Sequence, residues 1–231
     1  MTIVILLAGG NGTRFGSGRP KQFSSLDGKA LLEYSLDVIT SIKAIEKTIL
    51  VINKRFESDY DRILKKYTHE IHKVEGGDAR QLSVYNALMF IEKEMKPLKD
   101  TDVLIHDSAR PFSKTVFENV INGMVFENAV VPAIPLADTI YKCENNIVSD
   151  IPSRDQFVKV QTPQGFKFYK LLDCHKKAYG KKDVIYSDDG SLYLKYSNDS
   201  LKIVEGDQNN FKITKAVDLD IAQYILRNNQ V

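Results

Sequence analysis

A glycine-rich segment directly after the first apolar run constrains this 231-residue chain more than any other feature. The apolar run, Ile3–Leu7, has the composition of a strand buried in a sheet. Two cations, Arg14 and Lys21, lie within and after a set of five glycines: Gly9, Gly10, Gly12, Gly16 and Gly18. Because glycine has no Cβ, the backbone can approach a ligand closely, and its free N–H groups can form an anion-binding concavity. The segment therefore predicts a loop that binds the phosphates of a nucleoside triphosphate.

The spacing of this segment differs from two well-known phosphate loops. A P-loop has Lys followed by Ser or Thr directly after its last glycine, whereas Lys21 follows Pro20 and precedes Gln22. The dinucleotide-binding pattern Gly-x-Gly-x-x-Gly begins at Gly10, but residue 15 is Phe15 and Pro20 would break an early helix. A surface loop with ordinary charges is the weaker alternative, because strand, glycines and cations coincide.

Composition restricts the class of protein. A formal net charge of +2, with lysines interleaved among acidic residues, argues against binding nucleic acid through a basic surface. The two cysteines, Cys143 and Cys174, are far apart and predict neither a disulfide framework nor a zinc site. No stretch has the length of a membrane span, and the first apolar run is too short for a signal peptide. We therefore expect a soluble cytoplasmic protein that binds neither nucleic acid nor a membrane.

Apolar β-rich runs alternate with segments of helical periodicity along most of the chain. We expect strands at 3–7, 48–52, 70–74, 102–105, 129–133 and 201–204, and helices at 31–42, 56–67, 81–94, 115–126, 168–178 and 217–226. This order predicts an α/β fold in which a mainly parallel sheet carries helices on both faces. The length suits one domain over 1–231.

Residues 136–160 interrupt this alternation. Thr139–Lys142 and Ile147–Val148 flank a turn at Glu144–Asn146, and Phe157–Val160 follows as a further β-rich run. The pattern predicts a β-hairpin arm that projects from the sheet. Because a lone two-stranded hairpin is marginally stable in water, we expect the arm to pack on a second subunit and form a homodimer.

Polar clusters follow two of the expected strands, where ligands bind in open α/β sheets. The small residues of Gly76–Arg80, with Ser83 one turn later, would let a base or ribose approach a helix N-terminus, although a plain strand-to-helix turn is the alternative. Asp107 is a candidate Mg²⁺ ligand, because Mg²⁺ prefers one or two carboxylates with phosphate oxygens and water. A structural ion pair with Arg110 is its alternative role. We expect His106 to be a structural hydrogen-bond partner rather than a catalytic base.

Six motifs, in order, resemble those of the cytidylyltransferase family that makes CDP-activated polyol phosphates, and the similarity extends from Leu7 to about Ala222. The motifs are Ala8-Gly9-Gly10 with Arg14 and Pro20-Lys21-Gln22; Gly76-Gly77-Asp78 with Arg80 and Ser83-Val84; His106-Asp107-Ser108-Ala109-Arg110-Pro111; Asp138-Thr139; Thr162-Pro163-Gln164; and Asn210 with Lys212 and Thr214. One branch of the family acts on 2-C-methyl-D-erythritol 4-phosphate in isoprenoid synthesis. The other acts on D-ribitol 5-phosphate in wall or capsular polymer synthesis.

The resemblance implies a Rossmann-like fold of the nucleotide-diphospho-sugar transferase type, Mg²⁺ as cofactor, and CTP and a polyol phosphate as substrates. It implies nucleotide contacts from Ala8, Gly9, Gly10, Gly12, Gly77, Asp78, Arg80 and Ser83. It implies catalytic contacts with the triphosphate from Arg14, Lys21 and Lys212. It implies acceptor contacts from Asp107, which would also lie near Mg²⁺, and from Arg110, Thr139, Arg154, Thr162 and Lys212. Thr139 and Arg154 would reach across a dimer into the neighbour's site.

The implied reaction is in-line attack of the acceptor phosphate on the α-phosphorus of CTP, with pyrophosphate as leaving group. Both reactants are anionic, so positioning and cations should dominate catalysis. A phosphate monoester has a second pKa of about 6 and is largely ionised near neutral pH, so it needs no dedicated base.

Different motifs favour different acceptor substrates. His106–Pro111 and Ser187–Asp189 are more similar to the methylerythritol branch, whereas Asp150–Arg154 is more similar to the ribitol branch. We expect methylerythritol phosphate, the acceptor of the more abundant branch, with ribitol 5-phosphate as the alternative. More distant alternatives are a UTP- or GTP-dependent sugar-phosphate nucleotidyltransferase and a non-catalytic nucleotide-binding module.

Overall fold

A mixed, mainly parallel sheet forms the centre of the protein. The computed structural model describes residues 1–10 and 20–228, and in this part of the chain the sheet has eight strands in the order β10-β7-β11-β6-β1-β4-β5, with β12 paired to β7. The strands are β1 (Thr2–Leu7), β4 (Ile45–Ile52), β5 (Ile71–Glu75), β6 (Asp102–Asp107), β7 (Ala129–Pro135), β10 (Val158–Val160), β11 (Gln164–Lys167) and β12 (Lys202–Glu205). The pairs β1–β4, β1–β6, β4–β5 and β7–β12 are parallel, whereas β10 and β11 run antiparallel to their partners. The expected sheet is confirmed.

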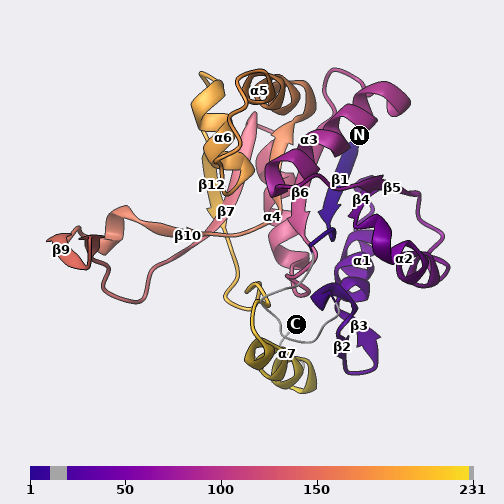
Figure 1. Ribbon diagram of the computed structural model, residues 1–231, viewed down its shortest axis with the longest axis horizontal. Coiled ribbons are helices and arrows are strands. Elements are labelled where there is room, and N and C mark those ends of the chain that lie inside the picture. Colours follow the sequence, from indigo (N-terminus) through magenta and orange to yellow (C-terminus); the bar gives the residue numbers. More distant parts are fainter. Residues whose placement is uncertain (11–19, 229–231) are drawn as a thin grey trace.

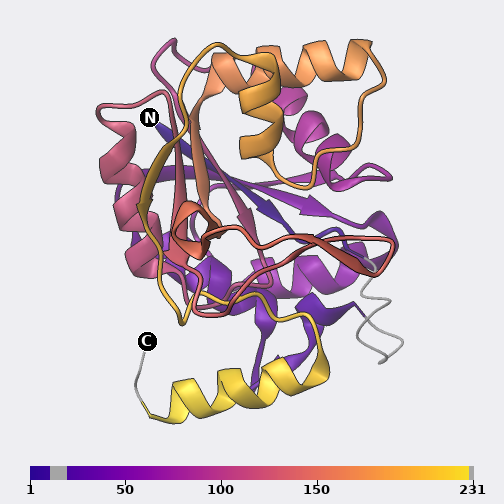
Figure 2. The same ribbon diagram turned by 90° about the vertical axis from the view of Figure 1, so that its left-hand side faces the viewer.

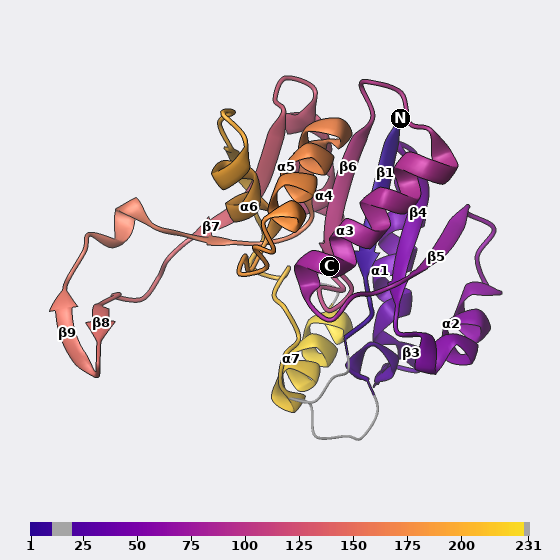
Figure 3. The same cartoon turned by 45° about the horizontal axis from the view of Figure 1, so that its top comes forward.

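Helices cover both faces of this sheet, as expected (Figures 1 and 3). They are α1 (Leu31–Ser41), α2 (Glu57–Leu64), α3 (Arg80–Phe90), α4 (Lys114–Met124), α5 (Phe168–Gly180), α6 (Asp189–Tyr196) and α7 (Ala216–Arg227). Successive side chains of a strand point to opposite faces. Ile3 and Ile5 of β1 therefore pack in one buried cluster with α3, α5 and α6, and Val4 and Leu6 pack in a second with α1, α2 and α4.

Shorter elements complete the fold. Three 3₁₀ segments lie at Lys21–Phe23, Lys54–Phe56 and Arg154–Gln156, a π turn at Ile91–Met95 extends α3, and β2 (Ser25–Leu26) pairs with β3 (Lys29–Ala30). The sequence did not predict β11 or α6 as elements. Both are short, and the glycine in each, Gly165 and Gly190, weakens the apolar pattern of its segment.

The arm is a hairpin that extends away from the helices and sheet (Figure 1). Its strands, β8 (Lys142–Glu144) and β9 (Ile147–Asp150), form a separate two-stranded sheet. Asn145 and Asn146 join them with positive φ angles of 51° and 62°, as a two-residue hairpin turn requires.

Two details of the expected arm were wrong. Phe157–Val160 does not belong to the hairpin, because β10 pairs antiparallel with β7 in the main sheet. Of the expected run Thr139–Lys142, only Lys142 lies in a strand, because β8 begins at that residue. Alternating apolar residues predict a strand, but they do not specify which neighbour it pairs with.

The C-terminal helix α7 packs beside the end of the sheet at which β1 and β6 finish (Figure 2). Ala222 and Ile225 of α7 share a buried cluster with Leu31, Phe112 and Ile213. This packing brings the segment before α7, which carries Lys212, back to the carboxyl ends of the strands. No helix among residues 1–10 and 20–228 is long and apolar enough to cross a membrane.

Candidate active site

A cavity of about 540 Å³ opens where the carboxyl ends of β1, β4 and β6 meet the N-terminus of α3. Most of the residues that the sequence predicted to bind nucleotide or phosphate line it: Ala8, Gly9, Gly10, Lys21, Gly77, Asp78, Arg80, Ser83, Asp107 and Lys212. These residues come from four separate stretches of the chain. Parallel strands therefore bring the predicted motifs to one place, as open α/β sheets do.

The remaining predicted residues lie elsewhere. Arg110 and Thr162 are buried, with 7% and 5% of their surface exposed, and neither lines the cavity. Thr139 and Arg154 lie on the arm, where Arg154 donates to the carbonyl of Ala137 at 2.9 Å. Gly12 and Arg14 lie outside the described residues.

Buried side chains fix the start of the glycine loop. Gln22 Nε2 donates to the carbonyls of Ala8 at 2.5 Å and Gly10 at 3.1 Å, and the Tyr60 hydroxyl donates to the Ala8 carbonyl at 2.6 Å. A Cβ on Gly9 would lie 3.2 Å from the Ile52 carbonyl oxygen, closer than an ordinary contact. Tyr60 was not among the predicted site residues, because its place in an expected helix gives no sign of the contact with Ala8.

The two lysines of the cavity are linked through one segment. Lys21 Nζ donates to the carbonyl of Ile213 at 2.8 Å, and the amide of Ile213 donates to the carbonyl of Ala109 at 2.8 Å. Lys212 is thereby held opposite the N-terminal loop. Lys21 and Lys212 must lie close together if both are to contact one triphosphate, and the structure meets this requirement.

Asp107 lies between two cations. Its Oδ2 accepts from Lys212 Nζ at 2.7 Å, and its Oδ1 lies 3.6 Å from Arg80 Nε. Burial alone would raise the pKa of the Asp107 carboxyl, but Arg80 and Lys212 outweigh it and hold the pKa well below its usual range. Asp107 is therefore an anion throughout the physiological pH range, and it holds Lys212 at the cavity wall.

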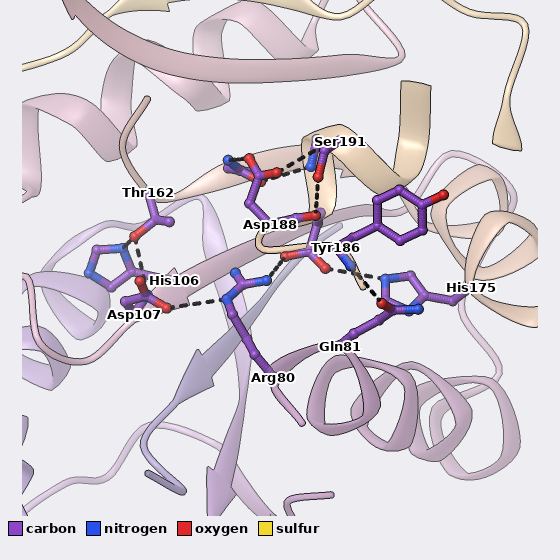
Figure 4. A network of polar contacts seen from close by, with 12 residues as sticks. Arg80, Gln81, His106, Asp107, Thr162, His175, Tyr186, Asp188 and Ser191 are labelled. Atoms are coloured by element: carbon purple, nitrogen blue, oxygen red, sulfur yellow. Dashed lines mark hydrogen bonds and ion pairs between the residues drawn. The ribbon is translucent and has the colours of Figure 1, made fainter. Parts of the chain in front are cut away.

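His106 is fully buried next to Asp107. Its Nε2 lies 3.2 Å from the Arg110 carbonyl oxygen, which can only accept, so Nε2 carries the proton and Nδ1 accepts from the Thr162 hydroxyl at 3.1 Å. The Thr162 oxygen in turn accepts from the Asp107 amide at 3.2 Å (Figure 4). Burial lowers the pKa of His106 to about 4, so the imidazole is neutral at physiological pH. This geometry agrees with the expected structural role.

The ion pairs of Asp107 are with Arg80 and Lys212, so Arg110 does not form the structural pair with Asp107 that was its alternative role. Arg110 Nη1 donates to the Asn210 carbonyl at 2.6 Å, and the Asn210 amide donates to the carbonyl of Thr162 at 2.9 Å. Burial lowers the pKa of the Arg110 guanidinium, although the negative charge of Asp107 raises it. These hydrogen bonds of Arg110, Asn210 and Thr162 connect the segments that follow β6, β10 and β12.

The described residues of the cavity could bind Mg²⁺ through one carboxylate, with the other ligands supplied by a bound triphosphate and water. Among residues 1–10 and 20–228 no group of three His, Cys, Asp or Glu side chains is arranged to hold a metal ion. Asp107 offers a single carboxylate at the wall, its side chain 12% exposed. Mg²⁺ commonly takes one carboxylate and completes its shell with phosphate oxygens and water, so the cavity fits a metal that arrives with a triphosphate.

Comparison with known proteins agrees with this geometry. Residues 2–228 match the model of the 2-C-methyl-D-erythritol 4-phosphate cytidylyltransferase family. A protein of that name from Thermosipho africanus is 38% identical over 96% of each chain, and one from Clostridium botulinum is 38% identical over 98% of this chain and 99% of the relative. Among solved structures, 4-diphosphocytidyl-2C-methyl-D-erythritol synthase from Anaerococcus prevotii has a TM-score of 0.85 at 31% identity, with 98% of each chain covered. With a full-length match in sequence, in fold and in the motifs around the cavity, the chain belongs to the 2-C-methyl-D-erythritol 4-phosphate cytidylyltransferase family.

Proposed function

We propose that this protein transfers the CMP group of CTP to 2-C-methyl-D-erythritol 4-phosphate and releases pyrophosphate. The observation that carries the proposal is the convergence of Gly9, Gly10, Lys21 and Lys212 on one cavity of about 540 Å³. That volume lies within the roughly 300–1,000 Å³ typical of small-molecule sites. Membership of the family supports the choice of both substrates.

The nucleoside end of CTP would lie against backbone rather than long side chains. Gly77 packs so closely on α3 that a Cβ there would lie 2.6 Å from the Leu82 Cβ, and its amide donates to the Ser83 hydroxyl at 3.0 Å. We assign the base and ribose to this wall, which Ala8, Gly9, Gly10, Gly12, Gly77, Asp78, Arg80 and Ser83 would form. Gly12 belongs to the proposal on the resemblance alone.

Catalysis would depend on charge rather than proton transfer. The acceptor phosphate is already ionised above its second pKa of about 6, and the buried neutral His106 is unsuited to act as a base. Lys21 and Lys212, with Arg14 from the glycine loop, would contact the triphosphate and stabilise the charge that develops at the α-phosphorus. Asp107 would orient Lys212 through their 2.7 Å contact.

A divalent metal would accompany the triphosphate. Asp107 would hold Mg²⁺ as its single protein ligand, and the ion would supply charge neutralisation and alignment of the phosphate oxygens.

The acceptor would bind between Asp107, Lys212 and an arm from a second subunit. Arg110 and Thr162 would support this side of the site through their contacts with Asn210. The arm exposes a set of large apolar side chains: Tyr141, Ile147, Val148, Ile151 and Phe157. Their burial against a second copy would stabilise a marginal hairpin and bring Thr139 and Arg154 to the partner's site. We therefore include a homodimer in the proposal.

Pyrophosphate release from CTP and Mg²⁺ tests the proposal, with 2-C-methyl-D-erythritol 4-phosphate and D-ribitol 5-phosphate as acceptors in parallel. Ribitol phosphate is the second candidate because Asp150–Arg154, on the arm, is more similar to that branch. We expect rapid release with the methylerythritol acceptor. Faster release with ribitol phosphate would overturn the choice of acceptor, and no release with either would overturn the activity.

A further inference from the structure

Arg80 bridges two buried carboxylates, only one of which faces the cavity. Its Nε lies 3.6 Å from Asp107 Oδ1 (Figure 4), and its Nη1 donates to Asp189 Oδ2 at 2.7 Å. Asp107 in turn holds Lys212 through its other oxygen. The four charged groups therefore form a chain that begins outside the cavity, at Asp189, and ends on Lys212 at its wall.

Asp189 is placed to act on the cavity without touching what binds there. Its side chain is 2% exposed, and it does not line the cavity. It is the first residue of α6, where the preceding Asp188 caps the helix by accepting from the Ser191 amide at 3.1 Å. Asp188 thus meets the need of the helix for a cap, which leaves the Asp189 carboxylate free for Arg80.

His175 of α5 fixes the second oxygen of Asp189. Its Nε2 lies 3.2 Å from Asp189 Oδ1, and only 1% of its side chain is exposed. With one oxygen toward His175 and the other toward Arg80, the carboxylate has one orientation available. A rigid buried anion of this kind holds a guanidinium more firmly than an exposed pair does.

We propose that Asp189, held by His175, is a positioning residue that keeps the Arg80 guanidinium facing Asp107 through Nε alone and so leaves Asp107 Oδ2 for Lys212. The inference rests on the proposed function, because it assigns Asp189 a part in the same cytidylyl transfer. It adds to the reaction two residues that lie outside the cavity.

The geometry gives the reason. A guanidinium and a carboxylate prefer a two-bond, fork-to-fork pair. Without an anion at its far end, Arg80 would turn and pair with both oxygens of Asp107, in competition with Lys212. The remaining group of Arg80, Asp107 and Lys212 would also carry one net positive charge, which would attract the triphosphate. The loss of Asp189 should therefore displace Lys212 from its working position while CTP binding is kept or strengthened.

A purely structural ion pair predicts the opposite pattern for CTP. If Asp189 only stabilised the packing of α6 on α3, its loss would loosen the cavity wall and weaken CTP binding together with turnover. The equilibrium Kd for CTP and the kcat of the reaction therefore separate the two roles.

The test compares wild-type protein with Asp189→Asn, which keeps the shape and removes the charge. We expect kcat to fall about 10- to 100-fold, because a small misplacement of a catalytic group lowers the rate by this order. The Kd for CTP, measured by calorimetry, should be unchanged or lower. Asp199→Asn is the matched control, because Asp199 pairs with Lys170 and Tyr193 away from Arg80 and its loss should leave both quantities unchanged.

A second comparison asks whether Asp189 acts through Arg80. In an Arg80→Gln background, adding Asp189→Asn should lower kcat no further, since the residue that it positions is already gone. An equal loss in both backgrounds, a wild-type kcat in Asp189→Asn, or a parallel rise in Kd would overturn the inference.

His175 supplies an independent route should Asp189→Asn fail to fold. His175→Leu removes the donor to Asp189, and His175→Gln keeps one. We expect a lower kcat with unchanged CTP binding in the first variant and recovery toward wild type in the second, and equal kcat values in the two would overturn the inference. Inactive wild-type protein would contradict the proposed function itself, whereas active wild type with unaffected variants would contradict only the role of Asp189.

Discussion

Lys212 Nζ lies 2.7 Å from Asp107 Oδ2, although 105 positions separate the two residues in the chain. Asp107 ends β6, and Lys212 lies in the segment between β12 and α7. Packing of α7 and Ile213 on Phe112 brings the two together. The contact therefore depends on the whole fold, and it places a cation at the wall of the cavity.

Replacing Asp107 should cost stability in a pH-dependent way. Its pKa lies below the value of about 4 expected in the unfolded chain, so its contribution is present above that pH and is lost as pH falls through the folded-state pKa. Asp107→Asn, which leaves Arg80 and Lys212 without their shared anion, should lower the free energy of unfolding at pH 7 by on the order of 3 kcal/mol. Urea unfolding from pH 7 to pH 2 measures this, and a difference that did not shrink below pH 4 would contradict the assignment.

Lys21→Ala should abolish turnover without unfolding the protein. Lys21 lines the cavity and donates to the Ile213 carbonyl at 2.8 Å. Removing one donor that stabilises transition-state charge typically costs about 3 kcal/mol, roughly 100-fold or more in kcat. Lys29→Ala is the matched control, because Lys29 forms an exposed pair with Asp37 and should be dispensable. Near-normal pyrophosphate release by Lys21→Ala, with an intact circular dichroism spectrum, would refute its role.

His106 should contribute to the acid sensitivity of the fold. Burial lowers its pKa from 6.5 to about 4, so the unfolded chain takes up a proton first and stability is lost as pH falls from about 6.5 toward 4. Relative to His106→Gln, the wild type should lose roughly 2–3 kcal/mol of unfolding free energy between pH 7 and pH 4.5. Chemical denaturation of both proteins at the two pH values provides the comparison. Parallel pH dependence of the two would show that the imidazole is not held neutral.

Mixed subunits should reveal whether the arm completes a neighbour's site. On the proposed mechanism, Lys212→Ala should inactivate the cavity of its own subunit, and Arg154→Ala should inactivate only the site that its arm reaches. Equal mixing of the two inactive variants after subunit exchange should restore about a quarter of wild-type activity, because half of the dimers carry one intact site. Sedimentation of each variant confirms dimer formation. Mixtures as inactive as their components would mean that Arg154 serves its own subunit, and an active Arg154→Ala protein would mean that it serves neither site.

Much of the fold was predictable from local patterns. Ile3–Leu7 and Thr48–Ile52 are continuous apolar runs, and such runs are typical of strands covered on both faces. The helices α1, α4, α5 and α7 have apolar residues at helical spacing, and their observed ends lie within two residues of the expected ones. The partner of Phe157–Val160 could not be predicted, because its pairing with β7 depends on where the chain returns after the arm.

The residues of the candidate site that stand in ordered motifs could be predicted from the sequence. The single polar residues that hold them in place could not. Gly9, Gly10, Gly77, Lys21, Asp107 and Lys212 stand in such motifs and line one cavity. Arg110 stood in the same kind of motif, yet its guanidinium is buried against the Asn210 carbonyl. Tyr60 and His175 carry no local signal, since their partners lie 52 and 14 positions away in the chain.

The identity of the product tests the central claim most directly. Phosphorus-31 NMR of a reaction with CTP, Mg²⁺ and 2-C-methyl-D-erythritol 4-phosphate should show the CTP and monoester signals replaced by pyrophosphate and by the coupled pair of a CDP diester. With ribitol 5-phosphate supplied instead, the pyrophosphate and diester signals should form more slowly. Unchanged CTP and methylerythritol phosphate, or a diester formed only from ribitol phosphate, would contradict the account.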